Sequence, residues 1–124
     1  MNLRRLLGAR GETLAARYLR RTAGHRILKK NYRSPAGEID LISVDGDTLV
    51  FVEVKTRASD ESADPLDSVN RAKRMQIERA ARHFAMRHRT QHLPMRFDLI
   101  RVVWPPHGSP VIEHFPDAFH ARGG

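Results

Sequence analysis

Charged and apolar residues alternate through two β-rich runs in the stretch 37–57, and this alternation is typical of half-buried β-strands. The dipeptide Asp45-Gly46 lies between the runs and suits the positive φ angles that a tight hairpin turn requires. The pattern therefore predicts an antiparallel hairpin with a two-residue turn at Asp45-Gly46. In that register Glu38 lies opposite Glu53 on the neighbouring strand.

The two faces of this hairpin differ in polarity. Successive side chains of a strand point to opposite faces of the sheet, so any even-length turn produces one apolar face and one charged face. The apolar face holds Ile39, Leu41, Val50, Val52 and Val54. The charged face holds Glu38, Asp40, Glu53 and Lys55.

The charged face brings three carboxylates onto neighbouring strands, where like charges destabilise a sheet. Lys55 supplies one compensating charge. A divalent cation such as Mg²⁺, which binds one or two carboxylates and retains several waters, is the obvious source of the remainder. The simplest alternative is a solvated ion pair between Glu53 and Lys55. Because the acids gather at one end of the hairpin, we favour a functional site there.

The other elements follow from helical and alternating spacing. Apolar spacing predicts a helix over 3–21 that Gly24 ends. A second helix is expected to start at an N-cap near Asp67-Ser68 and to end near Leu93-Pro94, with Ala72 on its inner side. Further strands are expected at 25–33, 96–104 and 111–115, and Phe119 is expected in the core. The order is helix, three strands, helix, two strands, which indicates an α/β layered domain around a mixed sheet. A chain of 124 residues supports one core, so we expect a single domain over residues 1–124.

Glu12 lies at the border of the apolar stripe of the first helix. Its neighbours three and four residues away are glycine or alanine, so it has no helical ion-pair partner. A solvated glutamate remains the alternative to a functional one. Gly8 and Gly11 weaken an isolated helix by about 1 kcal/mol each, so we expect close approach to another element as compensation.

The chain carries a net charge of +8, which favours a polyanionic partner, most simply nucleic acid. The second helix has one acid, Glu78, against a run of basic residues: Arg71, Lys73, Arg74, Arg79, Arg82, Arg87 and Arg89. No apolar run is long enough to span a membrane, and arginines interrupt the N-terminal leucines where a signal peptide would need an apolar core. We therefore expect a cytoplasmic protein without a membrane partner.

Four motifs together resemble the YraN family of small bacterial proteins. They are Gly11-Glu12, Gly37-Glu38-Ile39-Asp40-Leu41-Ile42, Phe51-Val52-Glu53-Val54-Lys55-Thr56-Arg57 and Arg96-Phe97-Asp98. That family resembles the archaeal Holliday junction resolvases and, by its motifs, the PD-(D/E)xK nuclease superfamily. The resemblance implies a restriction-endonuclease-like fold with a mixed central sheet flanked by helices. It also implies a helix-borne glutamate at Glu12, metal ligands at Asp40 and Glu53, and a catalytic lysine at Lys55.

The predicted function is that of a Mg²⁺- or Mn²⁺-dependent endonuclease that selects branched or duplex DNA by structure. Asp40, Glu53 and Glu12 would be the metal ligands, with Lys55 beside the attacking water. The expected nucleic-acid contacts are Arg57, Arg71, Lys73 and Arg74. A junction cutter also needs two sites, so a homodimer is possible. The alternative is a non-catalytic nucleic-acid-binding protein on a nuclease scaffold.

Overall fold

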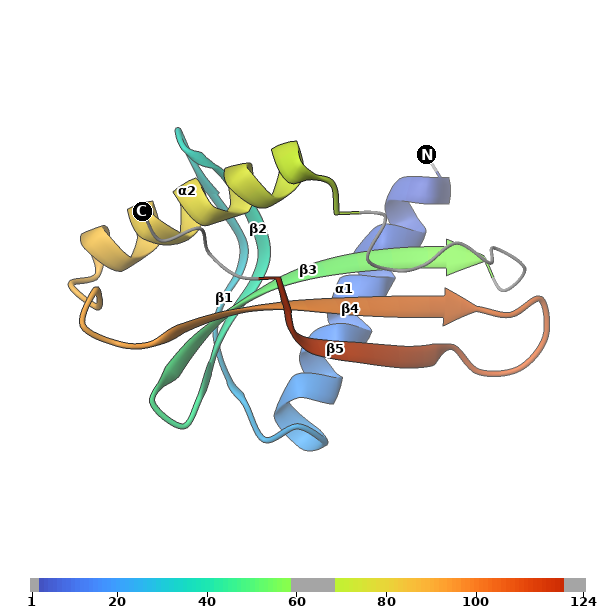
Figure 1. Cartoon of the computed structure of the whole chain (residues 1–124). Helices are drawn as coiled ribbons and strands as arrows, with labels where there is room; N and C mark the ends of the chain where they lie inside the picture. Colours follow the sequence, from blue (N-terminus) through green and yellow to red (C-terminus); the bar gives the residue numbers. More distant parts are fainter. Residues whose placement is uncertain (1–2, 59–68, 120–124) are drawn as a thin grey trace.

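A computed structural model describes residues 3–58 and 69–119, with the side chains of residues 3–5 excepted. The elements follow the predicted order (Figure 1). They are α1 (Leu3–Arg21), β1 (Arg26–Ser34), β2 (Gly37–Asp45), β3 (Thr48–Ala58), α2 (Arg71–Arg87), β4 (Met95–Trp104) and β5 (Val111–Phe119).

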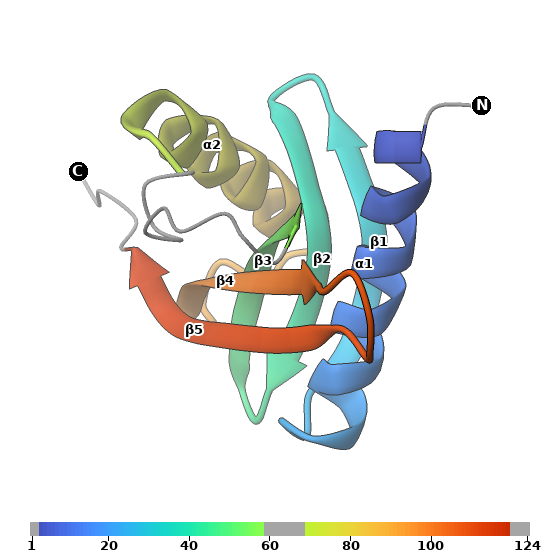
Figure 2. The ribbon, with the colours of Figure 1, turned by 90° about the vertical axis from the view of Figure 1, so that its right-hand side faces the viewer.

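The strands form one five-stranded sheet in the order β1-β2-β3-β4-β5. All neighbours are antiparallel except β3 and β4, which are parallel and are connected through α2. The two helices lie on opposite sides of the β1–β2 hairpin (Figure 2). This mixed sheet with flanking helices confirms the predicted fold class and is compatible with a restriction-endonuclease-like core. No helix in the described part of the chain is long and apolar enough to cross a bilayer.

A separate apolar core lies on each face of the sheet. Under α2, the ring of Phe97 stacks between Phe51 and Phe119, with ring centroids 5.6 and 5.3 Å apart. This packing confirms Phe119 as a core residue. Under α1, small residues allow the helix to lie close to the sheet: Ala15 and Ala16 are buried against strand residues that include Val50, Val52 and Val102.

The β2–β3 hairpin has its turn one residue later than predicted. Its facing pairs run from Asp45↔Thr48 to Leu41↔Val52, so Gly46 and Asp47 form the turn. Gly46 has φ of 64° while neither neighbour has a positive φ, as in a type II′ turn with glycine first. The register therefore shifts by two residues, which preserves the assignment of residues to faces.

Four details of the sequence prediction are wrong. The alternation predicts Ile39 and Leu41 on the same face, but Ile39 packs in the core under α2 and Leu41 packs under α1. The β1–β2 hairpin is strongly curved (Figure 1), and this curvature separates the two side chains. Helix α2 is capped by Asn70, whose side chain accepts from the Lys73 amide at 2.9 Å, whereas the predicted cap lies outside the described residues. The predicted inner residue Ala72 is exposed. The helix also ends at Arg87 rather than near residue 93.

Both edge strands of the sheet are irregular. In β1 the register shifts between Ile27 and Lys29, and Asn31 has φ of 52°. In β5 the pairing with β4 shifts beside Leu99, the strand contains Pro116, and Asp117 has φ of 53°. Neither edge therefore presents a regular ladder of backbone groups.

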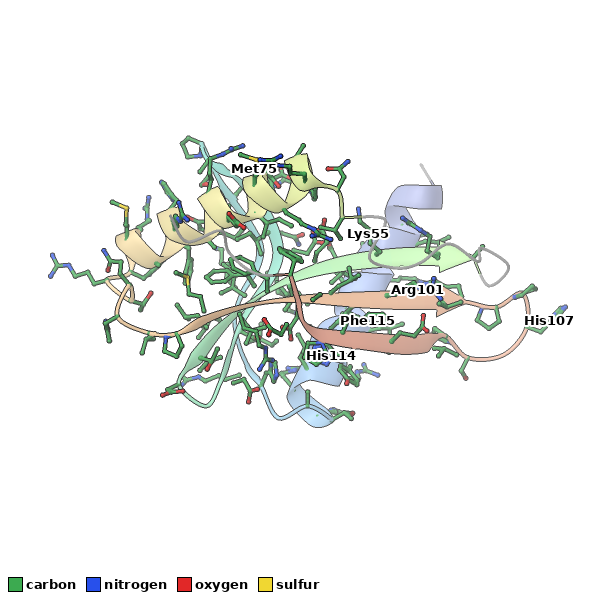
Figure 3. All side chains as sticks on the ribbon, in the orientation of Figure 1. Lys55, Met75, Arg101, His107, His114 and Phe115 are labelled. Carbon is green, nitrogen blue, oxygen red and sulfur yellow. The ribbon has the colours of Figure 1, made fainter. Side chains whose placement is uncertain are left out.

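A buried polar network on the α1 face ties β4 to β5. The fully buried Asp98 carboxylate accepts two hydrogen bonds from Arg96, at 2.9 and 3.0 Å, and one from the Asp117 amide at 2.9 Å. His114 Nε2 lies 2.8 Å from the same carboxylate, and Tyr18 of α1 contacts the other ring nitrogen at 3.2 Å. Burial alone would raise the pKa of Asp98, but these partners lower it overall. In Figure 3 the labelled His114 lies on β5 in front of α1.

Replacing Asp98 by Asn should lower the free energy of unfolding by about 1–3 kcal/mol, because the half-buried Arg96 keeps Asp45 as a partner but loses the buried carboxylate that accepts two of its hydrogen bonds. Urea unfolding followed by circular dichroism at pH 7 measures the loss. Asp47→Asn, in the exposed turn, is the matched control and should change stability by less than about 0.5 kcal/mol. Equal stability of the two variants would show that the network contributes nothing.

Candidate active site

The carboxyl cluster lies where β2 and β3 diverge. Their pairing ends at Leu41↔Val52, and beyond it β2 turns away from β3 (Figures 1 and 2). The next amide on β3 that faces β2, that of Val54, donates to the side chain of Asp40 at 2.8 Å. The Asp40 carboxylate is thereby held in the gap between the two strands.

Glu53 is the buried acid of the cluster, with 4% of its surface exposed. It lies on the α2 face of β3, and two ammonium groups approach its Oε2 atom. Lys73 Nζ of α2 lies 3.4 Å away and Lys55 Nζ 3.8 Å away. Neither contact is a hydrogen bond, and Oε2 is buried without a hydrogen-bond partner among the described residues. Lys55 lies between β3 and the start of α2 in Figure 3.

Glu12 reaches the cluster from the opposite face because α1 lies unusually close to β3. A Cβ atom added at Gly11 would lie 2.2 Å from Thr56 Oγ1, so only glycine allows this approach. This confirms the expected close contact for Gly11. The same expectation is not met at Gly8, where an added Cβ would have no atom of the described residues within 4 Å.

Asp40 interacts with both glutamates and raises the pKa of each. Burial, repulsion by Asp40 and a hydrogen bond with Asp40 raise the pKa of Glu12 to about 7, partly opposed by Arg33. Burial, a hydrogen bond with Asp40 and repulsion by Asp40 raise the pKa of Glu53 to about 8, partly opposed by Lys73 and Lys55. The sequence prediction that Asp40, Glu53, Lys55 and the helix-borne Glu12 lie together therefore matches the geometry.

These residues fit a divalent cation on chemical grounds. The donors are hard carboxylate oxygens, which Mg²⁺ and Mn²⁺ prefer. The Oε2 atom of Glu53 has no hydrogen-bond donor among the described residues, and Asp40 repels Glu53. A bound cation would stabilise both carboxylates. Among the described residues, no three histidine, cysteine, aspartate or glutamate side chains are arranged to hold a metal by themselves. The set therefore fits Mg²⁺ bound by two carboxylates and waters.

One acid predicted for this face lies outside the cluster. Glu38 is exposed and lies 3.7 Å from Arg33 across the β1–β2 hairpin. It does not contribute to the pKa shifts of Glu12 or Glu53.

The four residues expected to contact nucleic acid occupy different environments. Lys73 turns inward to Glu53. Arg74 donates to the Val69 carbonyl at 2.9 Å and lies over the Phe119 ring. Arg57 is half-buried, with a hydrogen bond to the carbonyl of Thr56. Arg71 is exposed at the start of α2. Nucleic-acid contact by these residues stays a prediction.

The chain resembles a family of bacterial proteins over most of its length. A family model described as "Uncharacterised protein family UPF0102" matches residues 11–102. The chain belongs to this family. UPF0102 is the YraN family, so the resemblance seen in the motifs is confirmed. The matched segment includes Glu12, Asp40, Glu53, Lys55 and Lys73.

Individual UPF0102 proteins match at similar levels of identity. The UPF0102 protein of Chlorobium chlorochromatii is 47% identical over 118 residues, covering 91% of this chain and 90% of its own length. That of Anaeromyxobacter dehalogenans is 41% identical, with 97% and 88% covered. That of Syntrophotalea carbinolica is 44% identical, with 94% of each covered.

The close packing of α1 in this UPF0102 protein predicts opposite effects for two glycine substitutions. Gly8→Ala should stabilise the fold by up to about 1 kcal/mol, because it improves helix propensity without a clash. Gly11→Ala should destabilise it by about 1–3 kcal/mol, because its methyl group overlaps Thr56. Thermal unfolding measures both changes. Adding Thr56→Ala to Gly11→Ala should restore most of the loss; failure of this rescue would locate the constraint elsewhere.

The raised carboxyl pKa values predict how stability depends on pH without metal. Between pH 4.5 and about 8 the unfolded chain ionises Glu53 while the folded chain keeps it protonated, so stability falls as pH rises. Glu53→Gln stays neutral and should not show this fall. In EDTA, the variant should match wild type near pH 4.5 and exceed it at pH 8 by at least about 1 kcal/mol, a few degrees in Tm.

The quantity to compare is the difference between the two proteins at each pH, measured by thermal unfolding. Burial lowers the pKa of His25, and this group acts in the opposite direction over the same range, so wild-type stability alone is not diagnostic. Glu38→Gln is the matched control and should follow the wild-type curve. A Glu53→Gln curve parallel to wild type would mean that Glu53 is ionised in the folded protein.

Proposed function

We propose that this UPF0102 protein is a metal-dependent endonuclease that hydrolyses phosphodiester bonds in structured DNA. The observation that carries the proposal is that Asp40 interacts with both Glu12 and Glu53, while the buried Oε2 atom of Glu53 has no hydrogen-bond donor among the described residues. Mutually repelling, desolvated acids lower stability unless a cation joins them. The cluster therefore supports cation binding over a purely structural role.

Asp40, Glu53 and the Val54 carbonyl would hold Mg²⁺ or Mn²⁺, with Glu12 joining directly or through water. Two carboxylates suffice, because Mg²⁺ keeps several waters and also binds substrate phosphates. When bound, the ion polarises a phosphoryl oxygen and lowers the pKa of the attacking water.

Two lysines approach Glu53 from different elements, and we assign a different role to each. Lys55 lies on the same strand and the same face, so we assign to it the positioning of the attacking water and the stabilisation of charge on the phosphoryl oxygens. Lys73 approaches from α2, and we assign to it the binding of the scissile phosphate. Both lysine side chains are partly exposed, by 28% for Lys55 and 37% for Lys73, so a substrate phosphate can approach them.

The charge of the chain supports a substrate selected by backbone and shape. The net charge is +8, and α2 exposes Arg71, Arg79 and Arg87 along its outer side. Such residues contact phosphates, which position a nucleic acid without reading its bases. We therefore propose branched or duplex DNA with weak sequence preference. Two cuts across a junction would require two sites, which a twofold dimer supplies.

Nicking of fluorescent junctions, flaps and single strands in Mg²⁺ or Mn²⁺ tests the proposal. Asp40→Asn and Glu53→Gln should abolish cleavage, and Lys55→Ala should reduce it by about 10²-fold or more. Glu38→Gln, a carboxylate outside the cluster on β2, is the matched control and should cleave like wild type. The proposal fails if the purified protein cuts none of these substrates and binds no metal.

A non-catalytic nucleic-acid-binding protein is the second candidate, and one observation favours it. Both lysines lie within 4 Å of Glu53, so the protein already supplies part of the missing positive charge. Calorimetric titration of Mg²⁺ into wild type and Asp40→Ala separates the candidates. Binding that disappears in Asp40→Ala supports the enzyme, whereas no binding to either protein, together with retained DNA affinity, supports the scaffold.

A further inference from the structure

A groove of about 740 Å³ runs between β1 and the C-terminal half of α2. We call it the β1–α2 groove; the lining residues that matter here are Lys29, Tyr32, Arg33, His83, Arg87 and His88. None of the acids of the carboxyl cluster lines this groove. None of the four sequence motifs contains these six residues.

The β1–α2 groove is basic. Lys29, Arg33 and Arg87 line it, and no acidic residue is among the described residues that do so. Neither Lys29 nor Arg87, both exposed, forms an ion pair with a described residue. Arg33 pairs only with the exposed Glu38 at 3.7 Å, and such surface pairs contribute little, so Arg33 can turn to an anion at small cost.

The same groove holds two imidazole rings in defined positions. The His88 ring lies against Phe84, with centroids 4.4 Å apart, and Phe84 is itself buried. His83 Nδ1 lies 2.6 Å from the hydroxyl of the buried Tyr32. Rings supported in this way can stack on nucleobases. A duplex buries its base faces in its own stack, so this combination of cations and rings fits an unpaired strand.

One lining residue of the groove lies near the carboxyl cluster. Arg33 lines the groove and is close enough to Glu12 to lower the pKa of that glutamate. Across the β1–β2 hairpin, Tyr32 faces Ile39 and Lys30 faces Leu41, so β1 runs alongside the segment of β2 that carries Asp40. A nucleic-acid strand that leaves the groove past Arg33 would therefore approach Glu12.

We propose that the β1–α2 groove binds an unpaired strand of the DNA whose backbone reaches the carboxyl cluster. Phosphates would contact Lys29, Arg33 and Arg87, and bases would stack on His83 and His88. The choice of DNA rests on the proposed function, and the groove then narrows the substrate to a branched molecule with a single-stranded arm. The rival occupant is an extended peptide added to the edge of β1.

Fluorescence anisotropy with a labelled 15-nucleotide oligo-dT in EDTA tests the phosphate contacts. The double variant Lys29→Ala/Arg87→Ala should bind about tenfold more weakly at 0.1 M salt. The slope of log affinity against log salt should fall by about 0.7 for each lost phosphate contact. The matched control is Arg17→Ala/Arg26→Ala, which removes the same charge from exposed positions on α1 and β1 outside the groove, and its slope should stay near wild type.

An oligonucleotide with abasic sites tests the base contacts. Wild type should bind it about fivefold more weakly than oligo-dT, and this ratio should approach one in His88→Ala. Equal effects of the two double variants, or an unchanged ratio in His88→Ala, would overturn the groove assignment.

The binding test is independent of the cleavage test. A protein that cuts nothing but loses oligo-dT binding in the groove variant would refute the nuclease and retain the groove. A protein that cuts DNA, but whose groove variant binds oligo-dT like wild type, would retain the nuclease and refute the groove.

Discussion

The hydrogen bond from the Val54 amide to the Asp40 carboxylate controls the geometry of the site. It replaces a backbone bond at the point where the β2–β3 ladder stops. Because a side chain satisfies that amide, β2 can turn away from β3 without leaving a buried donor unpaired. The divergence opens a gap in the sheet, where Glu12 of α1 interacts with Asp40 and Lys73 of α2 approaches Glu53.

The two helices bring groups of opposite charge into this gap. Helix α1 contributes an acid, Glu12, whose approach depends on the missing side chain at Gly11. Helix α2 contributes a cation, Lys73, at the buried Glu53. Residues 12, 40, 53 and 73 come from four separate elements, so the site exists only in the complete fold. This is the arrangement expected when a rigid scaffold holds reactive groups that repel one another.

The sequence could predict the faces of the hairpin better than its register. Alternation is a local property with period two, so a register error of two residues left Asp40, Glu53 and Lys55 on the predicted side. The turn position depends on which residue takes positive φ, and Asp45-Gly46 and Gly46-Asp47 are both acceptable turn dipeptides. The face of Ile39 depends on the curvature of the β1–β2 hairpin, which no local pattern encodes.

The sequence contained a signal for the inward position of Lys73, but it contained little signal for the Asp98 network. Lys73 lies four residues before Ile77 and seven before Ala80, on the apolar stripe of α2, so its inward position could have been found from helical spacing. By contrast, the Asp98 network joins residues from three elements. Only the Arg96-Phe97-Asp98 motif hinted at it, and long-range partners such as Tyr18 and His114 cannot be inferred from a single sequence.

The irregular edge strands also limit how copies of this chain can associate. Exposed lysines, a register shift and the positive φ of Asn31 interrupt β1, while Pro116 and Asp117 interrupt β5. These are the devices by which natural sheets avoid edge-to-edge aggregation. A sheet continued across two molecules would need regular backbone partners that neither edge offers. Both edges therefore disfavour an association in which the sheet of one copy continues into the sheet of another.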